Sequence, residues 1–231
     1  MIVAHKLAKR FNQIEAIREV SFSAEAGAIT GLVGPNGAGK STTLRILYGM
    51  ITPSSGFAEI AGIRVSENPV EARRRIGVLP HNAGIYPRLT ARENISYYGR
   101  LSGLSEELIA HRINELSSEL AMQAIIERRC QGFSHGQKTK VALARALIHE
   151  PACLLLDEPT TFLDLKVQVD VMTLLRSIAH NQGRTVVVVL HELNVASMFA
   201  DQLVMMRDGE IVASGRPSDI MTRENLKCVF G

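Results

Sequence analysis

The sequence predicts an α/β fold in which a mostly parallel sheet carries a helical insert. Three apolar runs indicate buried strands, at residues 28–34, 152–159 and 185–192. Continuous apolar runs of this kind are typical of parallel strands that are covered on both faces. Between the first two runs, from about residue 88 to residue 150, the hydrophobic pattern takes a helical period. We therefore expect central strands with helices inserted between them.

The strand at 28–34 is expected to lead into a helix over residues 40–50. Leu44, Leu47 and Ile51 recur there at helical spacing. The stretch ITPSSG then breaks the chain. The next residues, 57–65, alternate weakly, which predicts one short strand with an exposed face.

The helical insert shows two start signals of the same type. Thr90 and Glu93 have the spacing of a capping box, and so do Ser134 and Gln137, whose helix is expected to end before Pro151. Between them, residues 105–120 predict an amphipathic helix. Its apolar face is expected to hold Leu108, Ile109, Ile113, Leu116 and Leu120.

Composition excludes several classes of protein. The 231 residues suit one domain, and 26 basic against 23 acidic residues give a net charge of +3, too balanced for nucleic acid as the main partner. Three widely spaced cysteines form no metal or disulfide pattern and fit a reducing compartment. No signal core is visible, and the apolar runs are far shorter than the ~20 residues of a membrane span. We expect a soluble, cytoplasmic protein unless a partner holds it to a membrane.

The stretch GPNGAGKST fits the phosphate-loop pattern G-x-x-x-x-G-K-[ST], and it stands between a predicted strand and a predicted helix. Backbone N–H groups and a helix start form an anion site there, and glycines let the backbone approach phosphates. Lysine is expected to reach the β and γ phosphates, and serine to offer its hydroxyl to Mg²⁺. The residues are Gly34, Pro35, Asn36, Gly37, Ala38, Gly39, Lys40, Ser41 and Thr42.

Acidic residues and a histidine end the two later strands. Asp157 and Glu158 follow LLL, and His191 follows VVVVL. Because ligands of open α/β sheets bind at the carboxyl ends of the strands, these side chains should meet the phosphate loop. Asp157 is expected to hold Mg²⁺ through its water shell, and Glu158 to accept a proton from the attacking water. His191 could sense the γ-phosphate and orient that water.

Taken together, these motifs resemble the ATP-binding subunit of an ABC transporter along essentially the whole chain. Phe11 matches the aromatic residue that stacks on adenine. Residues 34–42 match Walker A, 153–158 match Walker B, and His191 matches the switch histidine. FSHGQ, at 133–137, matches the signature loop. TTFLD, at 160–164, matches the loop that crosses between subunits, through Leu163 and Asp164.

The resemblance implies a P-loop NTPase core with a mostly parallel sheet, a small antiparallel β subdomain and an inserted helical subdomain. It also implies one ATP-binding domain over residues 1–231, with 88–150 as the insert. In this family two ATP-binding subunits pack head to tail, here expected as a homodimer. The partners are then a second subunit and an integral-membrane permease that holds the chain at the inner face of the cell membrane. ATP and Mg²⁺ are the implied cofactors. The signature residues that would face a partner's ATP are Ser134, His135, Gly136 and Gln137.

Three positions depart from the family pattern. His81 occupies the position of a glutamine that contacts Mg²⁺ and the attacking water, and a neutral histidine could accept a hydrogen bond or bind metal there. His135 replaces the first glycine of the signature, where bound triphosphate would favour its protonated form. Phe162 replaces a small residue of the crossing loop.

The two halves of the chain resemble different transporters. Residues 76–104 and the signature resemble the sodium-efflux and drug-efflux branch, which we favour because this stretch includes the surface that meets the permease. Residues 157–196 and the C-terminal ENLKCVFG resemble iron-siderophore, haem or cobalamin importers. Two further alternatives are a soluble ABC ATPase without a transporter and an unrelated P-loop kinase or GTPase. One Walker A motif, no sustained heptads and the signature before Walker B favour the transporter.

Overall fold

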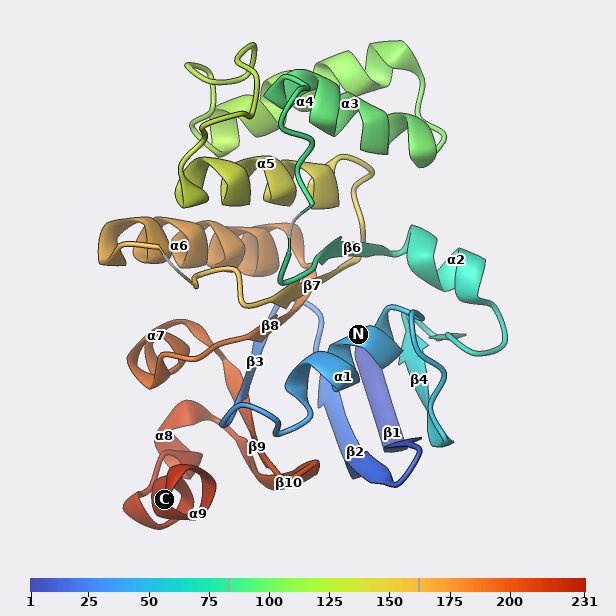
Figure 1. The fold of residues 1–231 in the computed structure, drawn as a ribbon, viewed down its shortest axis with the longest axis vertical. Coiled ribbons are helices and arrows are strands. Elements are labelled where there is room, and N and C mark those ends of the chain that lie inside the picture. The colour runs from blue at the N-terminus through green and yellow to red at the C-terminus, as the bar shows by residue number, and fades with distance from the viewer. Residues whose placement is uncertain (83, 162) are drawn as a thin grey trace.

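A six-stranded sheet forms the centre of the molecule (Figure 1), and its order is β10-β9-β3-β8-β7-β6. The computed structural model describes residues 1–82, 84–161 and 163–231, so Phe162 lies outside the described residues. All neighbouring strands of this sheet are parallel except the pair β9 and β10, which confirms the mostly parallel sheet. The strands are β3 (Ile29–Val33), β6 (Ile76–Leu79), β7 (Cys153–Asp157), β8 (Thr185–Val189), β9 (Gln202–Arg207) and β10 (Glu210–Gly215).

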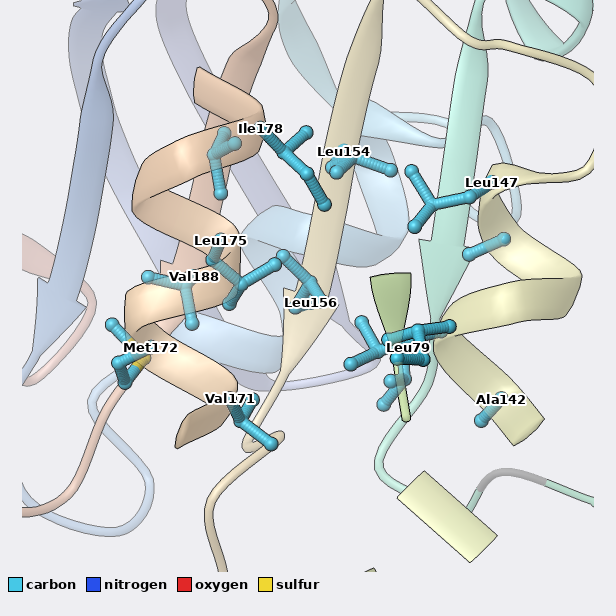
Figure 2. Close-up of a cluster of buried hydrophobic side chains, with 14 of the residues drawn as sticks. Leu79, Ala142, Leu147, Leu154, Leu156, Val171, Met172, Leu175, Ile178 and Val188 are labelled. Atoms are coloured by element: carbon cyan, nitrogen blue, oxygen red, sulfur yellow. The ribbon is translucent and has the colours of Figure 1, made fainter. Parts of the chain in front are cut away.

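The apolar runs form central strands because each face of the sheet has its own cover. Leu154 and Leu156 of β7 belong to one buried cluster, and Cys153 and Leu155 belong to another. Figure 2 shows Leu154 and Leu156 between the side chains of two helices, α5 (His135–Leu147) and α6 (Leu165–Gln182). A strand that is buried on both sides has no polar alternation, which explains the continuous LLL and VVVV runs.

A second, antiparallel sheet has the order β2-β1-β4-β5. The weak alternation over 57–65 predicted one strand, but the chain forms two strands there, because Ala61 and Gly62 turn with φ of 49° and 79°. Helix α1 (Lys40–Leu47) packs between the two sheets through Leu44 and Leu47. The strands are β1 (Ile2–Phe11), β2 (Ile14–Ala24), β4 (Ser55–Ile60) and β5 (Ile63–Arg64).

The segment between β6 and β7 is helical, and its helices gather at one end of the molecule (Figure 1). Both predicted capping boxes are present, at Thr90 and at Ser134. The apolar face of the middle helix is buried through Ile109, but Leu108 is 42% exposed and does not belong to it. The helices of this segment are α3 (Ala91–Leu101), α4 (Glu106–Glu119) and α5, and α2 (Pro69–Arg74) precedes β6.

Helix α6 connects β7 to β8 and packs on one face of the sheet. It ends where Gly183 takes a left-handed conformation, with φ of 67°. Short helices follow, namely α7 (Leu193–Phe199), α8 (Pro217–Ile220) and α9 (Arg223–Phe230). The first of them contacts α6 and β3, and the last two lie beside β9 and β10, at the end of the molecule opposite α3 and α4 (Figure 1). In the described parts of the chain, every helix lacks the length or the apolar character that crossing a bilayer requires.

The topology brings three chain segments to one edge of the sheet. The phosphate loop follows β3, Asp157 and Glu158 lie at the end of β7, and His191 comes shortly after β8. These three strands are adjacent and parallel, so their carboxyl ends meet. This is the edge at which α/β sheets bind ligands.

Candidate active site

The phosphate loop is pressed against neighbouring backbone, and two of its glycines are required by that contact. Gly34 has φ of 152°, and a Cβ there would lie 2.1 Å from the carbonyl oxygen of Met206. Gly39 caps α1 with φ of 98°, and a Cβ there would lie 2.8 Å from the carbonyl oxygen of Ala16. Only glycine combines a positive φ with so close an approach of neighbouring backbone. The absence of side chains at these positions also lets a ligand approach the backbone N–H groups of the loop.

Lys40 lies at the start of α1 and is 5% exposed. Its Nζ donates to the carbonyl oxygens of Gly34, at 2.7 Å, and Pro35, at 2.9 Å. Burial lowers the pKa of Lys40, and the negative charges of Glu158 and Asp157 oppose that effect. Lys40 therefore ties the loop together and places a cation beside the acidic pair.

Ser41 and Asp157 form a pair of oxygen ligands. The Ser41 hydroxyl donates to Oδ1 of Asp157 at 3.0 Å. Burial raises the pKa of Asp157, and the Ser41 hydrogen bond acts in the opposite direction. Hydroxyl and carboxylate oxygens suit Mg²⁺, which is bound by few protein ligands together with substrate phosphates.

Glu158 is held by two histidines, one at each carboxylate oxygen. His191 Nε2 lies 2.5 Å from Oε1, and His81 Nδ1 lies 3.0 Å from Oε2. At both contacts the carboxylate oxygen accepts and the imidazole nitrogen donates, which leaves Nε2 of His81 as the nitrogen that can accept in the neutral form. Glu158 also has φ of 58°, an uncommon left-handed conformation for glutamate. Backbone strain of this kind concentrates at functional sites.

The surroundings of Glu158 keep it ionised. Burial alone would raise the pKa of Glu158, but the His191 hydrogen bond and the charges of His191, His81 and Lys40 hold that pKa below its usual value. The carboxylate is thus ready to accept a hydrogen bond from water. Each added cation, however, makes it a weaker base.

A cleft of about 680 Å³ opens beside the phosphate loop and has Phe11 at its rim. Phe11 is 42% exposed, and Lys9 Nζ lies 5.1 Å from the centre of its ring. An exposed ring in this position could stack on a flat base. The cleft is lined by Phe11, Ile14, Glu15, Ala16, Arg18, Asn36, Gly37, Ala38, Gly39, Lys40, Ser41, Thr42, Glu158 and Asp208.

The signature residues form a capped helix start. Ser134 Oγ accepts from the backbone N–H of Gln137, and Gln137 Oε1 accepts from the backbone N–H of Ser134. A Cβ on Gly136 would lie 3.0 Å from Val167, so this glycine also lets the turn pack against α6. His135 is exposed. Among the described residues that line the cleft, none belongs to 133–137, so one chain does not bring its own signature to its own phosphate loop.

Asp164 begins α6, where its Oδ1 accepts from the backbone N–H of Val167 at 3.0 Å. Glu158 lines a second cavity of about 600 Å³, and His81, His135 and Lys138 line it as well. The fold therefore brings together six residues from four separate stretches of the expected site, namely Lys40 and Ser41, Asp157 and Glu158, His191, and His81. Asp164 and the signature residues do not line the cleft beside the phosphate loop, and of the signature only His135 lines the second cavity.

Two neighbours of the site were not among the predicted site residues. Thr161 Oγ1 donates to Glu158 Oε2 at 3.4 Å. Ile14 pairs with Phe11 across the β1–β2 turn, lines the cleft and is 71% exposed. An exposed isoleucine after an aromatic residue and a turn is a weak hint of a binding surface. Nothing in the spacing of Thr161 points to its role.

Comparison with known proteins places the chain among transporter ATPases. Three curated relatives are similar over most of their length. The ABC transporter ATP-binding protein NatA of Bacillus subtilis is 37% identical, over 93% of this chain and 89% of the relative. The hemin import ATP-binding protein HmuV of Rhizobium meliloti is 38% identical, over 100% of this chain and 91% of the relative. The Nod factor export ATP-binding protein I of Ralstonia nicotianae is 34% identical, over 94% of this chain and 68% of the relative.

A solved structure and a family match agree with these relatives. The dimeric ATP-binding cassette MJ0796, in a post-hydrolysis state with ADP and phosphate, is 29% identical and superimposes with a TM-score of 0.85, over 94% of this chain and 99% of the other. Residues 17–161 match the family described as ABC transporter. The chain therefore belongs to the ABC transporter family, as an ATP-binding subunit with ATPase activity.

Proposed function

We propose that the chain hydrolyses Mg²⁺-ATP with Glu158 as general base and drives export through a separate permease of the sodium-efflux or drug-efflux type. The observation that carries the hydrolytic part is the placement of Glu158 beside Lys40 and the Ser41–Asp157 pair, with His191 on its Oε1. A carboxylate held in this way can take the proton of an attacking water.

Each of the other residues has a task in this proposal. The N–H groups of residues 34–42 and the cation of Lys40 bind the phosphates, and Phe11 stacks on adenine. Ser41 and Asp157 hold Mg²⁺, which neutralises phosphate charge when it is bound. His191 fixes the position of Glu158 and faces the γ-phosphate. The measurement of turnover in Glu158→Gln, argued in the Discussion, tests this assignment.

We also propose that two copies of the chain, in the cytoplasm, assemble head to tail on the permease. Ser134, His135, Gly136 and Gln137 of one copy would then cover the triphosphate bound by the other, with Asp164 beside the junction. Two features support this. Residues 133–137 do not line the cleft of their own chain, and the related cassette MJ0796 is dimeric by its description. A helix start is a natural partner for phosphate.

The surface for the permease is proposed to be an apolar groove of about 600 Å³ between β6, α3 and α5. Leu101 and Met50, at 65% and 68% exposed, stand at its rim, and Ile76, Val78 and Ala142 lie within it. Exposed apolar grooves mark interaction sites, and a helix with an apolar face fits such a shape. The occupant we propose is a cytoplasmic helix of the permease.

Leu101→Glu should abolish co-purification with the permease, because a charge would have to be buried in the groove. The control is Leu108→Glu, which adds the same charge at a 42% exposed leucine that does not line the groove. Thermal unfolding should be similar for both variants. Full permease binding by Leu101→Glu would place the permease elsewhere. If the wild-type chain also fails to bind the product of a neighbouring permease gene, a soluble ABC ATPase is the better reading.

Export is favoured by the segment that lines the groove. Ile76, Val78 and Leu101 lie in the stretch 76–104, which resembles the efflux branch. Import of iron-siderophore, haem or cobalamin is the alternative, because residues 157–196 resemble importers and HmuV is 38% identical. ATP-dependent accumulation of sodium or drug in inside-out vesicles that contain the chain and its permease would support export. ATP-dependent haem or cobalamin uptake by right-side-out vesicles would support import.

His81→Gln is expected to keep the Mg²⁺-ATPase rate or to raise it by up to about tenfold. A glutamine amide can still donate to Glu158 Oε2, but it carries no charge, so the pKa of Glu158 rises and the carboxylate becomes a stronger base. Steady-state turnover at saturating ATP measures the effect. His111→Gln is the matched control, because His111 meets Glu115 on the exposed face of α4. A collapse of activity in His81→Gln alone would give His81 a role of its own.

A further inference from the structure

Gln168 is a buried polar side chain that joins two loops of the site. It lies in the first turns of α6 and is 8% exposed. Its Nε2 lies 3.1 Å from the carbonyl oxygen of Leu163 and 3.2 Å from Oε1 of Glu192, and the carbonyl oxygen of Thr160 is 3.4 Å away. An amide nitrogen has two hydrogens, so it can donate to the loop before α6 and to Glu192 at the same time.

These two partners are next to residues of the proposed machinery. Leu163 immediately precedes Asp164, and Glu192 immediately follows His191. His191 in turn donates to the Glu158 carboxylate. Thr161 also donates to Glu158, through its backbone N–H to the carbonyl oxygen and through its hydroxyl to Oε2. The contacts form a closed ring that starts at Glu158 and runs through His191, Glu192, Gln168, the carbonyl group of Thr160 and Thr161.

Gln168 belongs to a helix that is packed firmly on the central sheet. Helix α6 packs on the sheet through Val171, Leu175 and Ile178, which are nearly or fully buried (Figure 2). Gln168 therefore stays at a fixed place while the two loops are held to it. Leucine at this position would make neither bond, and glutamate would set a second carboxylate against Glu192. The amide is the side chain that serves both loops.

We propose that Gln168 is a positioning residue that sets His191 against Glu158 according to the place of the Thr160 and Leu163 carbonyl groups. The inference rests on the proposed roles of Glu158, His191 and Asp164. When a second copy of the chain meets Asp164, a shift of the neighbouring Leu163 carbonyl passes through the Gln168 amide to Glu192 and so to His191. Gln168 touches neither nucleotide nor water in this proposal, so its effect falls on turnover and not on ATP binding.

Gln168→Leu should lower kcat between about 10-fold and 100-fold, the range in which small misplacement of catalytic groups acts. The KM for ATP of this variant should change by less than about twofold. The ATP-induced dimer, which is measured with Gln168→Leu added to Glu158→Gln, should change equally little. Gln182→Leu is the matched control, because Gln182 is an exposed glutamine near the end of the same helix. A kcat equal to that of the wild type, or an equal loss of ATP affinity and kcat, would overturn the proposal.

A second variant protects the test against a folding defect in Gln168→Leu. Glu192 is exposed, so Glu192→Leu breaks the same contact without disturbing the core. Its kcat should fall in the same direction, whereas Glu192→Gln keeps an acceptor oxygen and should stay within about threefold of wild type. In the double variant Gln168→Leu with Glu192→Leu, the losses should not multiply, since both remove one link. Multiplying losses, or wild-type turnover in Glu192→Leu, would contradict the ring.

The outcomes also separate this inference from the proposed function. If Glu158→Gln hydrolyses ATP normally, the assignment of the general base fails, and the ring has no catalytic centre to position. If Glu158→Gln is inactive while Gln168→Leu turns over normally, the proposed function stands and only the role of Gln168 is wrong.

Discussion

Glu158→Gln should bind ATP with unchanged affinity, lose at least about 100-fold of its turnover and persist as an ATP-bound dimer. General bases contribute about 10²-fold to 10⁴-fold to catalysis, and an amide cannot accept the proton of water. The substitution is nearly isosteric, so an oxygen remains for the 2.5 Å contact with His191. In the proposed cycle ATP closes the dimer and hydrolysis opens it, so loss of turnover should leave the closed state populated.

Three measurements check this expectation: nucleotide affinity by fluorescence titration, phosphate release, and oligomeric state in ATP by light scattering. Glu127→Gln provides the control, because Glu127 is an exposed carboxylate that pairs with Arg92. That control should behave like the wild type in all three. Normal phosphate release by Glu158→Gln would remove Glu158 from the base role. Lost turnover without any dimer would leave the chemistry in place and contradict the head-to-tail assembly.

The elements that could be predicted from the sequence are those whose signals are local. The capping box of Ser134 and Gln137 is complete within four residues, and β7 and β8 are apolar at every position because both faces are covered. The segment at 57–65 was wrongly predicted as a single strand, since its two strands have only six and two residues and share one turn. Leu108 was misplaced because one residue of helix rotation moves a side chain off the buried face.

Although the family resemblance implied a small antiparallel β subdomain, the sequence pattern did not predict its long strands β1 and β2. Their pairing shifts register at several points, and Lys6 and Glu19 have positive φ, so a strict alternation of apolar and polar residues never develops. Their stability comes from α1 and β4, which close the second apolar cluster. A tertiary contact of that kind leaves no period in the sequence.

The candidate site also contains residues that local motifs predict and residues that only tertiary contacts reveal. The positions of Lys40, Ser41, Asp157 and Glu158 follow from motifs at the ends of predicted strands. The contact of His81 with Glu158 joins residues 77 positions apart, and only the fold places one imidazole at each oxygen. Gln168 and Thr161 are ordinary residues in the sequence, and their importance is visible only from the atoms to which they donate.

Lys40→Ala should weaken ATP binding by about 10-fold to 100-fold. A hydrogen bond to a charged group contributes about 1.5–3 kcal/mol, and this ammonium is the cation that we propose binds the phosphates. It is buried, and although burial lowers its pKa, Glu158 and Asp157 favour the charged form. Lys227→Ala is the control, because Lys227 is exposed on α9 and distant in sequence from the loop.

The bonds from Lys40 to the carbonyls of Gly34 and Pro35 require a further comparison, since their loss could loosen the loop without any phosphate contact. Thermal unfolding without nucleotide measures that effect alone. If Lys40→Ala lowers the midpoint only slightly while ATP affinity falls, the cation acts on the phosphates. If the midpoint falls steeply and ADP and ATP bind equally weakly, the lysine serves the loop. Unchanged ATP affinity would count against residues 34–42 as the phosphate site altogether.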